Sequence, residues 1–184
     1  NALRGKLRRL IGNQPRTGER LEVQSLNAVA GRLYERHIGK LHLVNEAEIG
    51  ALMTQCQQAQ GESAQRSGQR FLMNEWQDLV DAWQLDSWEA YRDVKRLGRK
   101  TRLSEAQRQV LWAIFANVQK ALAQTGGITH AAMFTALARQ LAVMPHPVFA
   151  HVVVDEAQDL SIAQIKFLAA LGSTQGTMRP NSLF

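Results

Sequence analysis

The sequence predicts an α/β protein that is mostly helical, in which a helical subdomain is inserted into a domain with a parallel sheet. Strand signals lie only near the two ends of the 184 residues, at 21–25 and 148–154. Between them, over about a hundred residues, apolar side chains recur almost entirely at helical spacing. Strands separated by a long helical stretch indicate an α/β domain with a helical insertion.

The N-terminal part is predicted to contain two helices with a short segment between them. Apolar residues recur at helical spacing over 3–11, and the polar residues 13–20 indicate a loop. The segment LEVQS, residues 21–25, is compatible with a short strand. Helical spacing then resumes over 26–37.

A capping box, in which Asn45 is followed three residues later by Glu48, predicts the start of the next helix. The polar residues 57–69 predict a mobile connection. The single cysteine excludes an intramolecular disulfide and indicates a reducing compartment, the cytoplasm. In the helix that follows Asn45, one face carries the apolar residues Ile49, Leu52, Met53 and Cys56.

Two more helix starts follow along the helical body. Helical spacing continues over 71–83, and Asp86 with Glu89 predicts a cap for a short helix. Ser104 with Gln107 predicts the cap of the most strongly periodic helix. The four tryptophans lie between residues 76 and 112, where helical spacing favours core packing over stacking on bases.

Gly126 and Gly127 predict the end of that helix, and one further helix is predicted over 134–141 before two prolines. The pattern then changes to VFAHVVV, residues 148–154. A continuous run of apolar and β-branched residues is typical of a strand buried on both faces of a parallel sheet, and it would bury His151.

Another capping box, Ser161 with Gln164, predicts a helix that ends at Gly172. The final residues 181–184, NSLF, are compatible with the start of another strand.

Charge favours a polyanionic partner. The formal net charge is +6 and the isoelectric point is about 10. One group of basic residues lies at 4–20 and another at 92–102; each is also compatible with an ordinary solvated helix surface. No apolar run is long enough to span a membrane, so no membrane partner is expected.

Two adjacent acids end the apolar run, in the sequence HVVVDEAQDL. The carboxyl end of a parallel strand is where ligands gather in open α/β sheets. Asp155 suits Mg²⁺, bound through water, and Glu156 could orient a water that attacks a γ-phosphate. The alternative is that both acids merely cap the next helix and interact with its dipole. Ser161 already caps that helix, which weakens the alternative.

The stretch VVVDEAQDLS followed by IAQIKFLAAL resembles motif II (Walker B) of the UvrD/Rep family of superfamily 1 helicases. Asp159 and the Q-x-x-F-L-x-x-L continuation fit this family better than the DEAD/DEAH helicases. The resemblance implies an ATP-dependent DNA helicase that translocates on single strands, with Mg²⁺ as cofactor and ATP as substrate. It further implies that Gln158 and Asp159 couple the ATP site to neighbouring motifs.

The resemblance also implies a domain organisation. Residues 1–36 and 146–184 would belong to the first RecA-like domain, a parallel-sheet domain of P-loop nucleotide hydrolases, and residues 37–145 to its inserted helical 1B subdomain. The stretch EVQSLNAVAGRLY, residues 22–34, is similar to a family segment on the single-stranded DNA path, with Ser25 where Thr is usual and Asn27 where His is usual.

Partners implied by the resemblance are single-stranded and duplex DNA, ATP and the rest of a helicase chain. The 1B subdomain contacts DNA in this family, which makes the second basic group a candidate interface. Its members are Arg92, Lys95, Arg96, Arg99, Lys100 and Arg102.

No G-x-x-x-x-G-K-[ST] motif occurs in the sequence, so a phosphate-binding loop is missing from it. The chain is therefore expected to be an internal fragment that is inactive alone. A second hypothesis is a non-catalytic module that binds nucleic acid or protein and carries a vestigial Walker B motif. The intact pair of Asp155 and Glu156 favours the first hypothesis.

Overall fold

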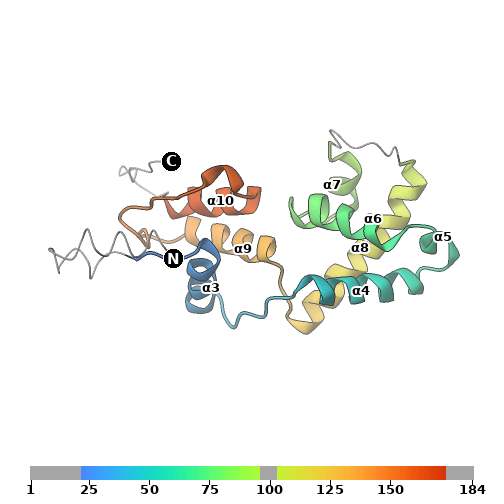
Figure 1. The fold of residues 1–184 in the computed structure, drawn as a ribbon, viewed down its shortest axis with the longest axis horizontal. Helices are drawn as coiled ribbons and strands as arrows, with labels where there is room; N and C mark the ends of the chain where they lie inside the picture. The colour runs from blue at the N-terminus through green and yellow to red at the C-terminus, as the bar shows by residue number, and fades with distance from the viewer. Residues whose placement is uncertain (1–21, 96–102, 173–184) are drawn as a thin grey trace.

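The structure, a computed structural model, describes residues 22–95 and 103–172, and these residues are predominantly helical (Figure 1). No helix in that part of the chain is both long and apolar enough to cross a membrane. In chain order the helical elements are α3 (Leu26–His37), α4 (Glu46–Ala59), α5 (Glu62–Gln65), α6 (Gln69–Glu75), the π-helix η1 (Trp76–Asp81), α7 (Trp88–Asp93), α8 (Glu105–Thr125), α9 (His130–Ala142), the 3₁₀ turn η2 (Ala157–Asp159) and α10 (Ile162–Leu171).

The helices form two lobes, each with a hydrophobic core of its own (Figure 1). The large lobe contains α4, α5, α6, η1, α7 and α8, and buried aromatic side chains lie at its centre. In the small lobe, α9 lies between α3 and α10 and packs most extensively on α10. Every pair of described helices in extensive contact belongs to a single lobe.

Local capping explains where several helices begin, as the sequence predicts. The three expected capping boxes are all present, at Asn45, Ser104 and Ser161. In each, the cap side chain accepts from a backbone N–H three residues on, and that residue's side chain accepts from the cap's N–H. Gly126 ends α8 in the left-handed conformation, with φ +66°.

One local prediction in the large lobe was wrong. The helix α7 is capped by Ser87, whose hydroxyl accepts from the N–H of Ala90, and not by Asp86. The polar stretch 57–69, expected as a mobile connection, contains the end of α4, the short α5 and the start of α6. The Gln57 amide donates to the carbonyls of Ala64 and Ser67 and holds this turn in place.

The tryptophans and the cysteine lie largely where helical spacing predicts. Trp76 is buried, and Trp88 and Trp112 pack against the large-lobe core, whereas Trp83 is half exposed. Cys56 also packs against this core, and burial raises the pKa of its thiol.

The predicted strand at 148–154 is absent: among the described residues the run is irregular, with one bridge position at Val153. Burial on both faces was also wrong. Val152 and Val154 pack on the small-lobe core, but Val153 is 85% exposed and His151 is exposed. A strand needs a neighbour to satisfy its backbone, and the described residues supply no second strand.

The segment expected at 21–25 as a short strand is likewise irregular from residue 22 onward. Glu22 and Gln24 instead bind Arg32 of α3, the first through an ion pair and the second through a hydrogen bond of 3.0 Å. The predicted helix over 3–11, the loop 13–20 and the final residues 181–184 lie outside the described residues.

Two connections, residues 38–45 and 126–129, join the lobes and meet in an isolated parallel bridge between Leu43 and Ile128. The N–H of Ile128 donates to the His42 carbonyl at 2.9 Å, and the N–H of Val44 donates to the Ile128 carbonyl at 3.0 Å. Gly127 allows this approach, because a Cβ there would lie 2.7 Å from the Val44 Cγ1 atom.

Replacing Gly127 by Ala should therefore destabilise the protein by about 1–3 kcal/mol, the usual cost of overpacking. The short, branched Val44 side chain cannot move its Cγ1 atom aside as the end of a long, flexible side chain could. Urea unfolding of Gly127→Ala would measure the loss. Gly68→Ala is the matched control, since a Cβ at Gly68 meets no atom within 4 Å; equal effects at both positions would contradict the explanation.

Candidate functional site

The acidic segment, residues 155–160, connects the irregular run 148–154 to α10 on the surface of the small lobe. Asp155, Glu156, Gln158 and Asp159 are all exposed. Glu156 has φ +55° and ψ +43°, a left-handed conformation that is uncommon for a residue with a side chain. Such backbone strain is found more often at functional sites than elsewhere.

Hydrogen bonds inside the segment hold Glu156 from both sides. Its backbone N–H donates to Asp155 Oδ1 at 3.1 Å, and its Oε2 atom accepts from the Gln158 side-chain amide. Its carbonyl accepts from the N–H of Asp159 at 3.0 Å, within the turn η2. The carboxylate of Glu156 thus points to a defined position although it lies at the surface.

These acids do not cap α10. Ser161 and Gln164 complete a capping box at its N-terminus, with hydrogen bonds of 3.3 and 2.8 Å. Within residues 22–95 and 103–172, no hydrogen bond joins the carboxylate of Asp155 or Glu156 to the backbone of α10. The helix-capping explanation for these two acids therefore loses its support.

Asp155 has the chemistry of a Mg²⁺ ligand, because its carboxylate is exposed and only its Oδ1 atom is engaged by Glu156. Mg²⁺ commonly takes one or two carboxylates and completes its shell with water and substrate phosphates. In the described part of the chain, no three His, Cys, Asp or Glu residues gather in one place.

The residues expected on a DNA path in the small lobe lie at the start of α3. Ser25 caps this helix, since its hydroxyl accepts from the N–H of Ala28 at 3.2 Å. Asn27 is exposed in the first turn. Ser25 therefore has a structural task as well, while the Asn27 side chain faces solvent.

Arg92 and Lys95 are the two described members of the second basic group. Both guanidinium contacts of Arg92 go to its neighbour Asp93, at 2.7 and 2.9 Å. This hydrogen bonding raises the pKa of Arg92 and lowers that of Asp93. Lys95 is exposed. The others, Arg96, Arg99, Lys100 and Arg102, lie outside the described residues, as does the first basic group at 4–20.

Sequence reasoning missed a polar contact between the lobes. The hydroxyl of Thr129, the N-cap of α9, donates to the Asp81 Oδ1 atom at 2.5 Å. The Gln84 amide donates to the same atom at 2.8 Å. Asp81 and Thr129 are 48 residues apart in the sequence, so no pattern of neighbouring residues predicts their contact.

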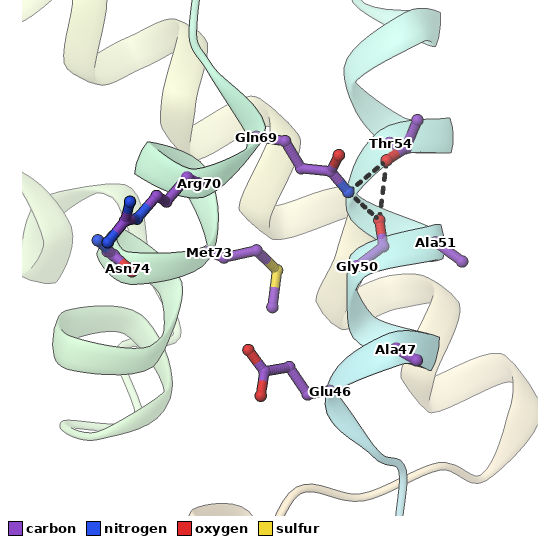
Figure 2. A pocket seen from close by; sticks show the side chains of 9 residues that line it. All are labelled: Glu46, Ala47, Gly50, Ala51, Thr54, Gln69, Arg70, Met73 and Asn74. Atoms are coloured by element: carbon purple, nitrogen blue, oxygen red, sulfur yellow. Dashed lines mark hydrogen bonds between the residues drawn. The ribbon is translucent and has the colours of Figure 1, made fainter.

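A groove of about 770 Å³ lies between α4 and α6 in the large lobe (Figure 2). It is lined by small residues such as Gly50 and by the charged residues Glu46 and Arg70. The Gln69 amide donates to the Thr54 hydroxyl at 3.0 Å, and that hydroxyl donates to the Gly50 carbonyl at 2.9 Å. These polar groups form hydrogen bonds with one another. The residues that line the groove do not belong to the acidic segment.

Comparisons with protein-family models, with curated proteins and with solved structures found no match to this chain.

Proposed function

We propose that this chain is part of an ATP-dependent DNA helicase that translocates on single strands, of the UvrD/Rep type. One observation carries the proposal: Asp155 and Glu156 are exposed and adjacent, and they lie a few residues before α10, which Ser161 and Gln164 cap. Their sequence context, VVVDEAQDLS, is that of a Walker B motif.

Each residue of the acidic segment has a proposed task. Asp155 would hold Mg²⁺ through water, and Glu156 would accept a proton from the attacking water. When bound, Mg²⁺ would neutralise charge on the phosphates of ATP. Gln158 holds the Glu156 carboxylate from one side, which leaves the Oε1 atom for water. Gln158 and Asp159 would couple this site to other helicase motifs.

In this proposal the helical insertion is narrower than the expected residues 37–145, because α9 packs on α3 and α10. The large lobe is the insertion, and the small lobe contributes to a RecA-like domain. The adjacency of residues 43 and 128 supports such an insertion, because both ends of the large lobe meet at one bridge. The sequence has no phosphate-binding loop. Other parts of a longer polypeptide would supply this loop and a second RecA-like domain.

The test is ATP hydrolysis by the full-length product of the gene that encodes this chain. We expect Mg²⁺-dependent turnover that single-stranded DNA stimulates, and no turnover above background from the 184 residues alone. Full-length protein that binds DNA without hydrolysing ATP would instead support the second candidate, a non-catalytic module with a vestigial motif.

DNA binding should depend more on Lys95 than on Arg92, because Asp93 already binds the Arg92 guanidinium. We expect Lys95→Ala to weaken binding to a fluorescent single-stranded oligonucleotide and to reduce the slope of log affinity against log salt by about 0.7, the value for one phosphate contact. Arg92→Ala should change the slope less. An affinity that is indifferent to salt in the unmodified chain would contradict phosphate contact altogether.

A further inference from the structure

The two lobes have little holding them in one orientation. Extensive helix-to-helix contacts stay within a lobe, and the described links between lobes are concentrated around two short connections. The bridge at Leu43 and Ile128 fixes where these connections meet, but two backbone hydrogen bonds leave rotation about them open. A separate contact is needed to set the angle between the lobes.

The contact between Asp81 and Thr129 is placed to do this. Asp81 ends η1 in the large lobe, whereas Thr129 begins α9 in the small lobe. The 2.5 Å hydrogen bond between their side chains lies immediately after the bridge residue Ile128. Because this bond joins the two lobes next to the bridge, it restricts rotation of one lobe relative to the other about the bridge.

Unusual backbone conformations before and after Asp81 in the sequence hold this residue in position. A π-helix is rare and often marks a functional position, and here it spans the six residues that end at Asp81. Gln84 has φ +52°, and its amide donates to the carbonyl and to the Oδ1 atom of Asp81 at 2.7 and 2.8 Å. Two unusual backbone conformations thus flank one carboxylate.

The environment makes this bond costly to lose. Thr129 is only 5% exposed, and burial raises the pKa of Asp81, while hydrogen bonds from Thr129 and Gln84 and the nearby His130 act in the opposite direction. A carboxylate that is partly removed from water depends more strongly on its hydrogen-bond donors than an exposed one does.

We propose that Asp81 is a latch that holds the large lobe against the N-terminus of α9, and that opening it frees the large lobe to swing about residues 38–45 and 126–128. The latch acts on α9, which packs along α10, and α10 begins directly after the acidic segment. The position of the large lobe is thereby transmitted to that segment. Such a latch operates whether or not the chain belongs to an ATPase.

The distance between the lobes, measured by electron paramagnetic resonance, tests the latch. Spin labels would be placed at Gln58→Cys in α4 and Lys166→Cys in α10, both exposed positions, in a Cys56→Ala background. We expect one narrow distance distribution for the parent protein. Asp81→Ala, which leaves the Thr129 cap of α9 intact, should broaden or shift it.

Three further variants separate the latch from a general loss of structure. Thr129→Ser keeps the hydroxyl and should retain the narrow distribution, whereas Thr129→Val removes it and should behave as Asp81→Ala does. Asp86→Ala removes the same charge from the turn after η1 and should change nothing. An unchanged distribution in both Asp81→Ala and Thr129→Val, with circular dichroism showing folded protein, would overturn the proposal.

Discussion

Replacing Glu156 by Gln is expected to lower kcat for ATP hydrolysis about 10²- to 10⁴-fold in the full-length gene product, which is the usual contribution of a general base. Gln has nearly the same shape but cannot accept the proton of the attacking water. ATP binding should survive, because Asp155 remains. Steady-state hydrolysis and equilibrium binding of a fluorescent ATP analogue would separate the two effects.

The matched control is Glu105→Gln, which changes an exposed glutamate at the start of α8 in the other lobe. Its turnover should equal that of the unmodified protein. Thermal unfolding should show that neither variant is destabilised, since Gln tolerates the left-handed backbone at 156 as poorly as Glu does. If Glu156→Gln hydrolyses ATP at the full rate, Glu156 is not the base.

Replacing Phe115 by Ala should destabilise the large lobe by about 3–5 kcal/mol, the range for a buried aromatic residue cut back to Ala. Phe115 is fully buried and lies against Trp76 and Tyr91, with ring centroids 6.0 and 5.7 Å away. The cavity would lie at the centre of the core, where neighbouring rings cannot easily fill it.

Hydrogen exchange should show that this loss is confined to one lobe. Amide protection is expected to fall in α4 and α8 and to persist in α9 and α10, because the two lobes have separate cores. Lys120→Ala, at an exposed position of the same helix, should stay within about 0.5 kcal/mol of the parent protein. Equal loss of protection in α9 and α10 would show that the lobes unfold as one unit.

Local signals predicted local structure well. The capping boxes at Asn45, Ser104 and Ser161 each involve side chains three residues apart, so the sequence contains the whole interaction. The cap of α7 was misplaced by one residue because Asp86 and Ser87 are both good caps. Only the geometry of the turn after η1 decides between them.

The run 148–154 shows where local pattern fails. Its β-branched residues favour an extended backbone, but strand formation depends on a partner elsewhere in the chain. The acidic segment was placed correctly between an apolar run and a capped helix. Its inner geometry was not foreseen, because the hydrogen bond from Gln158 to Glu156 depends on the left-handed backbone of Glu156.

Contacts between distant residues could not be predicted at all. The pairing of Asp81 with Thr129 requires a π-helix, a left-handed Gln84 and two lobes in one orientation. None of these leaves a signature in composition or spacing. The packing of α9 on α3 and α10 was not foreseen either, since the expected insertion, residues 37–145, included this helix.

The bridge between Leu43 and Ile128 also bears on how such a chain could be rebuilt. The large lobe leaves and rejoins the small lobe at neighbouring backbone positions. A short turn could span that gap, so the lobe is suited to excision, exchange or transplantation, as are other insertions whose ends lie close together. The same closeness makes the lobe a module that evolution can lengthen or reshape while α3, α9 and α10 keep their packing.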